Sequence, residues 1–415
     1  MVTGAGMAKR VVPEMWRHGV LVPSTRFSAQ KFTQVVHSEE LSLMHGKRWS
    51  RSGAAILMVM VCCLFTTNLT RGAVAPFSSA ALHKARLKAY WQMPLGLGAR
   101  THDRISHLWL LGRKVYVLTR YGYFICIKAS SGTILWTQKY AARGQATMEP
   151  VIYGKKRLLI VSGSKILIVK KSDGSVIKSQ SLKFAPSTRP VISNDRMFIG
   201  CYHNRMYALS PHLPLFMQWA QYSRGDAFLS RPVVLNGLVV CGSQNGHLWG
   251  HIATDGSSGW RRTLSGAVNA DLGTDGHLVF VPCLNHNLYA INASTGIAPW
   301  ITHLPGRLDH QPVMFGKQLL ICTGGAGLIS LKPSSGQIQW GPVQGVTRVV
   351  GKIGRRIAAA AGGKLLIISP IDGGVVYHVP ASTTCVYAKS TASQRVYVAS
   401  TSGYLMALVR RYPLN

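Results

Sequence analysis

The stretch NLYAINASTGIAPW, Asn287 to Trp300, combines alternating apolar residues, a Ser-Thr-Gly turn and a tryptophan four residues after Gly296. Strong copies are YFICIKASSGTILW from Tyr123, HLWGHIATDGSSGW from His247 and GLISLKPSSGQIQW from Gly327. Weaker copies begin at Lys165, Arg205, Lys364 and Tyr404. The first residues of successive copies are 42, 40, 42, 40, 40, 37 and 40 residues apart. A period of about 40 residues is typical of propeller blades.

Turn signals repeat with the same period. Pairs such as Asn236-Gly237 join two short apolar runs, which predicts a β-hairpin in each unit. A Pro-Val pair opens four units, and proline suits the first residue of a strand because it cannot donate to the ladder. These pairs begin at Pro150, Pro190, Pro232 and Pro312. We therefore expect an all-β, eight-bladed β-propeller with four strands in each blade. Eight units in step argue against the alternative, an open β-sandwich with coincidental spacing.

The glycine and the tryptophan of each copy have separate roles in this prediction. The glycine supplies positive φ for a tight turn, and the tryptophan packs against the neighbouring blade. The residues expected to do this are Gly132, Trp136, Gly256, Trp260, Gly296, Trp300, Gly336 and Trp340.

The eighth unit ends at LMALVRRYPLN and lacks the strand that carries the tryptophan. The missing strand resembles AYWQMPLG, residues 89–96, which matches APWITHLPG at residues 298–306. A propeller must close its ring or leave edge strands unpaired. We therefore predict that the segment around Trp91 forms the outer strand of the last blade.

An apolar segment lies before the repeats. Residues 54–65, AAILMVMVCCLF, are too few for a membrane span but suit the core of a signal peptide. We expect residues 44–75 to be a signal peptide or a membrane or lipid anchor, and residues 1–43 to be a non-structural extension or a misassigned start. Residues 76–88 are expected to be a linker, and residues 89–415 the propeller.

Three endings of the export segment stay open. Cys62 is a candidate lipid anchor, although Val61 before it makes a poor lipidation signal. Cleavage after AVA at residues 73–75 is the second ending, and an uncleaved anchor is the third. We expect an exported, periplasmic protein, with anchoring to the outer membrane left open.

The chain carries a formal net charge of +34. Such a field favours anionic partners, including acidic lipid surfaces and acidic protein faces. The basic residues are scattered rather than clustered with aromatic residues, so we expect no specific nucleic-acid recognition. An acidic habitat is an alternative explanation, because few carboxylates would be protonated as the pH falls.

The repeated pattern resembles the PQQ-like (pyrroloquinoline-quinone-type) propeller repeats over nearly all of residues 89–411. One branch of this family is the quinoprotein dehydrogenases. The other, which the chain resembles more, is the non-catalytic BamB-type lipoprotein of outer-membrane β-barrel assembly. Because one fold can host many functions, the branches must be separated by their sites.

Resemblance to the dehydrogenases would imply a calcium site built from carboxylates and an amide, with an aspartate base nearby. The repeat region holds one glutamate, Glu149, and its densest acidic pair is Asp271 and Asp275. Calcium needs several oxygen ligands. No Cys-x-x-Cys spacing predicts zinc. We therefore expect no catalytic residues, no cofactor and no metal, and we expect small buried side chains at Cys201, Cys241, Cys283 and Cys322.

Resemblance to the lipoprotein branch implies a partner-binding Arg-Gly-acidic sequence in a linker between blades. Arg224, Gly225 and Asp226 match it, whereas the next linker offers only Asp271, in a shifted register. The resemblance implies a scaffold, monomeric within a complex, whose partner is the barrel-assembly machinery. Two alternatives remain: a PQQ-like enzyme or small-molecule-binding propeller, and a basic envelope protein that binds anionic surfaces.

Overall fold

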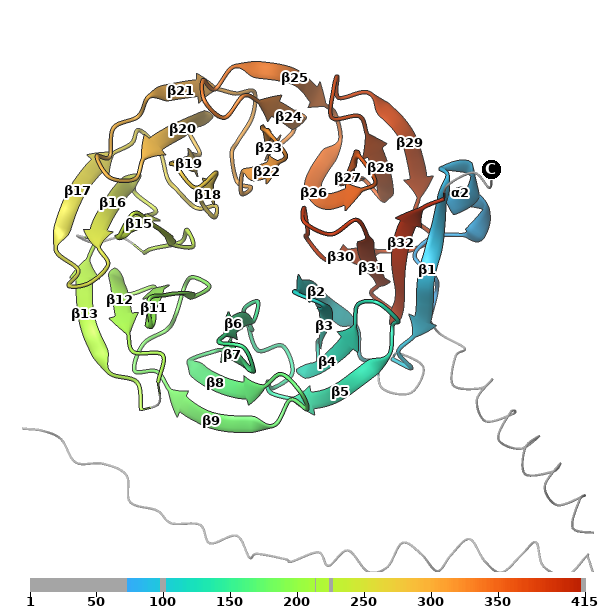
Figure 1. The fold of residues 1–415 in the computed structure, drawn as a ribbon, viewed down its shortest axis with the longest axis horizontal. Helices are drawn as coiled ribbons and strands as arrows, with labels where there is room; N and C mark the ends of the chain where they lie inside the picture. The colour runs from blue at the N-terminus through green and yellow to red at the C-terminus, as the bar shows by residue number, and fades with distance from the viewer. Residues whose placement is uncertain (1–72, 98–101, 213, 224–226, 412–415) are drawn as a thin grey trace, which may run out of the picture. The chain divides into compact units, whose positions relative to one another are not determined.

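The computed structural model describes residues 73–97, 102–212, 214–223 and 227–411. Their strands form eight four-stranded antiparallel sheets, arranged as blades around a common centre (Figure 1). The all-β, eight-bladed propeller predicted from the repeat is confirmed. Within the described residues, no helix combines the length and apolar character required to cross a bilayer.

The strands of blades 1 to 4 are, from the inside outward, β2 (Ile105–Leu111), β3 (Lys114–Thr119), β4 (Tyr123–Lys128) and β5 (Ile134–Lys139); β6 (Val151–Tyr153), β7 (Arg157–Ser162), β8 (Lys165–Lys170) and β9 (Val176–Ser181); β10 (Val191–Ser193), β11 (Arg196–Gly200), β12 (Arg205–Leu209) and β13 (Met217–Tyr222); and β14 (Val233–Leu235), β15 (Leu238–Gly242), β16 (His247–Ile252) and β17 (Ser258–Thr263). Those of blades 5 to 8 are β18 (Gly273–Thr274), β19 (Leu278–Pro282), β20 (Asn287–Asn292) and β21 (Trp300–His303); β22 (Val313–Phe315), β23 (Gln318–Thr323), β24 (Gly327–Leu331) and β25 (Ile338–Val343); β26 (Val346–Ile353), β27 (Arg356–Ala361), β28 (Lys364–Ile368) and β29 (Val375–Pro380); and β30 (Cys385–Tyr387), β31 (Val396–Ser400), β32 (Tyr404–Arg410) and β1 (Leu87–Pro94).

The ring is closed by β1, the first strand in the chain, which is the outer strand of blade 8. It pairs antiparallel with β32, from Leu87 opposite Arg410 to Pro94 opposite Tyr404. In Figure 1 the blue β1 lies beside the red β32. The predicted closure by the segment around Trp91 is therefore confirmed.

Residues 76–88 were expected to be a linker, but they pack against the propeller. Ser78 caps the helix α2 (Ser79–Lys84), because its hydroxyl accepts a hydrogen bond from the Ala81 amide. Phe77 and Leu82 are buried in a cluster with side chains of blades 7 and 8. A six-residue helix is too short to show a helical period, so the sequence pattern did not predict it.

The middle strands of each blade are buried on both faces. In β8, for example, the four residues from Ile166 to Val169 are all buried. Each sheet is covered by its two neighbours in the ring, so these strands are continuous apolar runs rather than alternating ones. The same packing buries the cysteines at positions 126, 201, 241, 283 and 322, all of which are free thiols.

A tryptophan on the outer strand of one blade packs on a glycine of the next blade at six of the interfaces. The pairs are Trp91 and Gly132, Trp136 and Gly174, Trp219 and Gly256, Trp260 and Gly296, Trp300 and Gly336, and Trp340 and Gly373. Each indole N–H also donates to a backbone carbonyl of the next blade, at 2.7 to 3.2 Å. The repeated Gly-x-x-x-Trp pattern thus fastens neighbouring blades to each other.

The remaining two interfaces are built differently. Between blades 2 and 3, the Tyr153 hydroxyl and the His212 ring nitrogen Nδ1 are 2.9 Å apart, and the Leu215 amide donates to the Gln180 side chain. Between blades 7 and 8, the cluster of Phe77 and Leu82 fills the interface. The outer strands at these two interfaces follow the copies from Lys165 and Lys364, which lack the tryptophan.

One buried histidine gives the fold a predictable response to pH. His251 in β16 is 3% exposed, and burial lowers its pKa to about 4. The unfolded chain binds this proton below pH ~6.5, whereas the folded chain does not until about pH 4. Protonation of His251 in the unfolded chain therefore lowers the free energy of unfolding as the pH falls from 6.5 toward 4, and it has no effect above pH 6.5.

We expect His251→Leu to remove part of this pH dependence. Between pH 7 and pH 4.5 the wild-type chain should lose about 2 to 3 kcal/mol of unfolding free energy that the variant does not lose. Urea unfolding of both proteins at the two pH values measures the difference. Equal losses in the two proteins would show that His251 is not buried as described.

Candidate functional site

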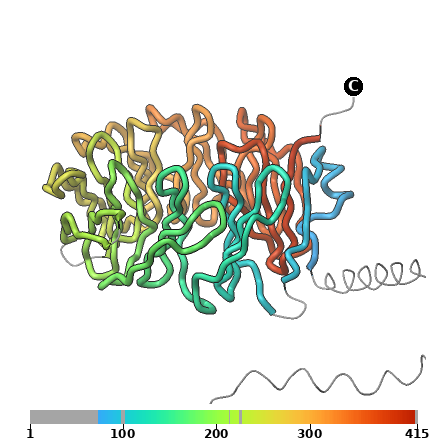
Figure 2. The backbone as a smooth tube through the Cα atoms, turned by 60° about the horizontal axis from the view of Figure 1, so that its bottom comes forward, coloured from blue at the N-terminus to red at the C-terminus, as the bar shows by residue number. Residues whose placement is uncertain are grey.

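The inter-blade linkers lie on one face of the ring. Each blade has four antiparallel strands, so it begins and ends on the same face, and Figure 2 shows the strands running between the two faces. We call this the linker face. It carries the linkers between blades and the turns that join the second and third strands of each blade.

A ring of polar side chains lies at the centre of the linker face. Its members occupy one position in six successive blades, five residues before the turn of the inner hairpin. They follow one another at intervals of 42, 40, 42, 40 and 40 residues. This polar ring consists of His107, Glu149, Arg189, Arg231, Asp271 and Gln311.

Members of the polar ring join adjacent blades. The Arg189 guanidinium forms an ion pair with the Glu149 carboxylate. The backbone amide of Arg231 donates to the Asp271 carboxylate at 3.0 Å. The side-chain amide of Gln311 donates to the Leu272 carbonyl at 2.8 Å. These bonds pair some of the polar groups at the centre, whereas, within the described part of the chain, the Nε atoms of Arg189 and Arg231 are buried without a hydrogen-bond partner.

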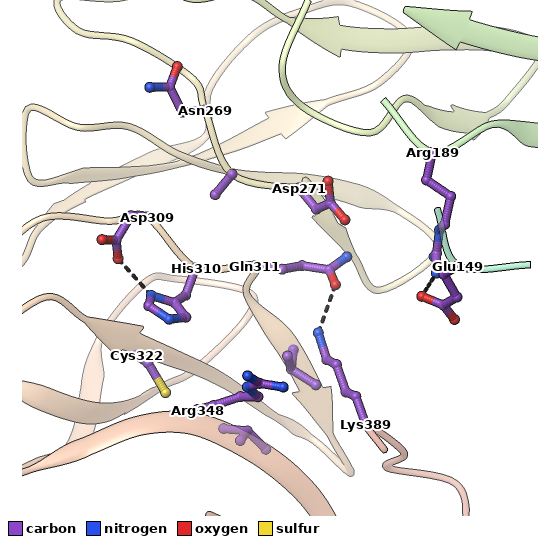
Figure 3. A pocket seen from close by; sticks show the side chains of 13 residues that line it. Glu149, Arg189, Asn269, Asp271, Asp309, His310, Gln311, Cys322, Arg348 and Lys389 are labelled. Atoms are coloured by element: carbon purple, nitrogen blue, oxygen red, sulfur yellow. Dashed lines mark hydrogen bonds and ion pairs between the residues drawn. The ribbon is translucent and has the colours of Figure 1, made fainter. Parts of the chain in front are cut away.

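Blades 7 and 8 depart from this pattern. The ring position is apolar and buried in both, at Val349 and Ala388. The adjacent residues, Arg348 and Lys389, are cationic and exposed. Figure 3 shows their side chains entering a pocket from one side, with those of the polar ring opposite.

This axial pocket has a volume of about 480 Å³. It is lined from blades 2, 3, 5, 6, 7 and 8, by residues that include Glu149, Arg189, Asp271, Asp309, His310, Gln311, Cys322, Arg348 and Lys389. The Lys389 ammonium donates to the Gln311 side-chain oxygen at 2.7 Å. His310 and Asp309 contact each other at 2.6 Å.

The Lys389 ammonium is poorly hydrated in the pocket. Burial lowers the pKa of Lys389 to about 8; Asp271 and Cys322 oppose this shift, and the charges of Arg231 and Arg348 add to it. Lys389 is exposed to solvent through the pocket, but protein atoms surround its sides. Its ammonium is therefore less hydrated than that of a lysine on an open surface. Burial, and then Arg348, also lower the pKa of His107.

The chemistry of the pocket does not resemble that of a metal or nucleophilic centre. Burial raises the pKa of the Cys322 thiol to about 11, so the thiolate nucleophile is scarce at neutral pH. Throughout the described ranges, no group of three or more His, Cys, Asp or Glu residues could hold a metal ion. The pocket can bind and orient charged groups.

The acidic pair Asp271 and Asp275 is separated by the fold. Asp271 belongs to the polar ring. Asp275 instead accepts the amides of His277 and Leu278 at 2.8 Å each, and so stabilises the β18–β19 turn. Asp271 therefore lines the axial pocket, whereas Asp275 stabilises a turn.

Arg224, Gly225 and Asp226 lie outside the described residues, as does Cys62. The linker that contains the motif is fixed at its described ends. The Ser223 amide donates to the Asn204 carbonyl at 2.9 Å, and the buried Phe228 accepts a hydrogen bond from the Ser187 hydroxyl. Both ends are thus held by blade 3 on the linker face.

Two exposed tyrosines flank the start of this linker. Tyr202 is 59% exposed and Tyr222 is 57% exposed. The Arg205 guanidinium lies 4.4 Å from the centre of the Tyr222 ring. Exposed tyrosine and arginine side chains are typical of protein interfaces.

The sequence contains a signal for the polar ring in the residues that precede the Pro-Val pairs. Glu149, Arg189, Arg231 and Gln311 are the residues directly before the four Pro-Val pairs. A polar residue at a fixed offset in an otherwise apolar strand indicates a shared position in the ring. Three further members of the interface pairs are Trp219, which stands one place late in its copy, and the glycines Gly174 and Gly373.

Comparison with known proteins matches most of this ring. The family model described as outer membrane protein assembly factor BamB matches residues 88–212 and 244–411. Proteins of the same name from Yersinia pestis and Escherichia coli K12 are 23% and 25% identical, each over 51% of this chain and 56% of the relative. The chain thus spans about half the length of these curated relatives. The protein of that name from Moranella endobia is 19% identical over 67% of this chain and 70% of its own length.

Solved structures share the fold. BamB from Moraxella catarrhalis has a TM-score of 0.62 at 14% identity, covering 79% of this chain and 99% of that one. Sqt1 from Saccharomyces cerevisiae has a TM-score of 0.58 at 10% identity, covering 74% of this chain and 95% of that one. At these identities the likeness shows the propeller fold alone. Together with the family match, it confirms the BamB-type, PQQ-like resemblance of the repeat.

Proposed function

We propose that the chain is a non-catalytic scaffold in outer-membrane protein assembly. The chain belongs to the family of outer membrane protein assembly factor BamB, and the proposal proceeds from that membership. The observation that carries this proposal is the family match over nearly the whole ring, residues 88–212 and 244–411. The structure supports a binding role, because a closed ring of interlocked blades holds many linkers in fixed positions.

A binding role also agrees with the chemistry of the described residues. Their buried thiols have raised pKa values, as at Cys241 and Cys322, and burial is the cause in both. The carboxylates at the centre are occupied by neighbouring groups, Glu149 by Arg189 and Asp309 by His310. These contacts favour a scaffold over the alternative of a PQQ-like enzyme.

We place the partner-binding surface on the linker face around the β13–β14 linker. Arg224, Gly225 and Asp226 match the partner-binding pattern of the family, and the exposed Tyr202 and Tyr222 lie beside the described end of that linker. Arginine and tyrosine carry much of the binding energy of protein interfaces, since both offer directed hydrogen bonds and large contact area.

We also place the protein in the cell envelope, exported by the segment 44–75, with Cys62 as the candidate lipid anchor. The support is the apolar run at residues 54–65 behind three basic residues, Lys47, Arg48 and Arg51. Recovery of the chain from the cytoplasmic fraction instead of the envelope would contradict this placement.

The partner surface is tested by Arg224→Ala and Asp226→Ala, with Arg307→Ala as the control. Arg307 is an exposed arginine in the β21–β22 linker of the same face, so the control loses the same charge. Arg224→Ala should weaken capture of the purified assembly partner by about 2 kcal/mol, because an arginine anchor is removed from the interface. Arg307→Ala should leave capture unchanged.

Circular dichroism and melting temperature establish that each variant is folded. Equal capture by the wild type and by both motif variants would remove residues 224–226 from the interface. A Tyr222→Ala variant tests the linker face independently of residues 224–226. If only this variant loses capture, the partner binds the linker face through Tyr222 and not through the motif.

A further inference from the structure

Two cations meet in the axial pocket without a carboxylate partner. Arg348 from blade 7 and Lys389 from blade 8 both direct their side chains into it (Figure 3). Among the described residues, neither forms an ion pair. The Lys389 ammonium is bonded to the neutral Gln311 side chain at 2.7 Å.

The three carboxylates of the pocket contact other groups, but only Glu149 pairs with an arginine. Glu149 pairs with Arg189, Asp309 contacts His310 at 2.6 Å, and Asp271 accepts the Arg231 amide at 3.0 Å. Cationic groups that are poorly hydrated and form no ion pair are costly, and an anion that enters the site lowers that cost, against the repulsion of the Asp271 carboxylate, whose charge reaches Lys389. The side of the pocket that carries Arg348 and Lys389 therefore favours an anion.

The size and surroundings of the pocket limit the ligand. A volume of about 480 Å³ admits a small molecule but not a folded segment of a partner. Arginine presents a planar fork of donors that matches the oxygens of a carboxylate or phosphate, and lysine adds a point charge. Because the pKa of Lys389 is lowered to about 8, an anion beside it would be bound with uptake of a proton at pH 8 and above.

We propose that the axial pocket binds a small oxyanion of the carboxylate or phosphate class, held by Arg348 and Lys389. The Gln311 side-chain oxygen accepts a hydrogen bond from the Lys389 ammonium and so orients the lysine. The site is independent of the scaffold function and of residues 224–226. It uses the two blades in which the polar ring is replaced by Val349 and Ala388.

Isothermal titration calorimetry with two probes, succinate and inorganic phosphate, at low ionic strength tests the proposal. We expect one saturable site for at least one probe, and the preferred probe identifies the chemical class. Arg348→Ala and Lys389→Ala should each weaken binding tenfold or more, because each removes a charge-assisted hydrogen bond. Arg355→Ala in the exposed β26–β27 turn removes the same charge from the same blade and should bind like the wild type.

The pH dependence provides a second readout. Succinate keeps its charge between pH 7 and 9.5, whereas Lys389 loses its proton through about pH 8 in the presence of Asp271, Cys322, Arg231 and Arg348. Affinity for succinate should therefore fall as the pH rises, and Lys389→Arg should keep the affinity and abolish this fall. If succinate does not bind, phosphate binding at pH 8 and above serves for the same comparison.

The proposal is overturned if neither probe shows saturable binding to the folded protein. It is also overturned if Arg348→Ala and Arg355→Ala weaken binding equally, since that would indicate only a diffuse attraction to a basic protein. Melting temperatures of all variants accompany the titrations, and the conservative Lys389→Arg variant keeps the test decisive if an alanine variant fails to fold.

Discussion

Deletion of residues 84–97 should leave a chain that aggregates or unfolds under conditions in which the intact propeller is a stable monomer. The deleted segment contains the whole of β1, the outer strand of blade 8. Its loss exposes the hydrogen-bonding edge of β32, and unpaired edges promote aggregation. It also removes the buried Leu87 and the contact of Trp91 with Gly132.

The size of this effect follows from the total stability of a domain. Removal of one large buried side chain costs about 2 to 5 kcal/mol, and domains are stable by only about 5 to 15 kcal/mol. Loss of a complete strand with its core residues therefore approaches or exceeds the whole stability. Thermal melting and size-exclusion chromatography measure the result.

A matched control and a rescue make the deletion specific. A chain that begins at residue 76 retains Phe77, α2 and β1, and it should melt like the longer protein. A synthetic peptide of residues 84–97 should restore part of the stability of the deleted chain, because it can pair with β32. A deleted chain that stays monomeric with an unchanged melting temperature would contradict closure by β1.

Gly296→Ala should destabilise the propeller by about 3 kcal/mol or more, clearly beyond Gly316→Ala. Both glycines have positive φ, +70° and +60°, so each alanine carries a similar backbone cost. A Cβ at Gly296 would lie 2.6 Å from the Trp260 ring, whereas one at Gly316 has open space. The difference between the variants, measured by urea unfolding, isolates the contact between blades.

A double-mutant cycle identifies the source of that difference. In a Trp260→Ala background the clash is absent, so the extra cost of Gly296→Ala should fall to that of Gly316→Ala. Trp260→Ala itself also removes the hydrogen bond to the Ala293 carbonyl at 2.7 Å. Equal destabilisation by the two glycine variants in the wild-type background would show that the tryptophan does not lock the interface.

The fold was predictable because each blade corresponds to one copy of a sequence repeat of about 40 residues. Glycine turns and tryptophans recur in each strong copy, and the match of residues 89–96 to residues 298–306 revealed the closing strand. Departures from the repeat were harder to interpret. Trp219 stands one place late because the segment from Leu209 to Met217 is one residue longer than the equivalent segment from Ile127 to Ile134, yet its ring still reaches Gly256.

The polar ring was not predicted, because its members are about 40 residues apart and become neighbours only when the ring closes. Read singly, Glu149 or Arg231 is one polar residue in a linker. Arg348 and Lys389 are harder still, since they lie one residue to either side of the ring position, at Val349 and Ala388. Their convergence depends on the irregular inner strands of blades 7 and 8, including the register shifts in β26.

The scaffold proposal is tested most directly by isolating the chain from the envelope fraction of its own host, at its native level of expression, with a C-terminal tag. The proteins that co-purify are quantified by mass spectrometry against an untagged strain. The account predicts that components of the outer-membrane protein assembly machinery are enriched in near-stoichiometric amounts, and that Arg224→Ala reduces them while Arg307→Ala does not. Recovery of the folded chain from the envelope without any of these components would contradict it.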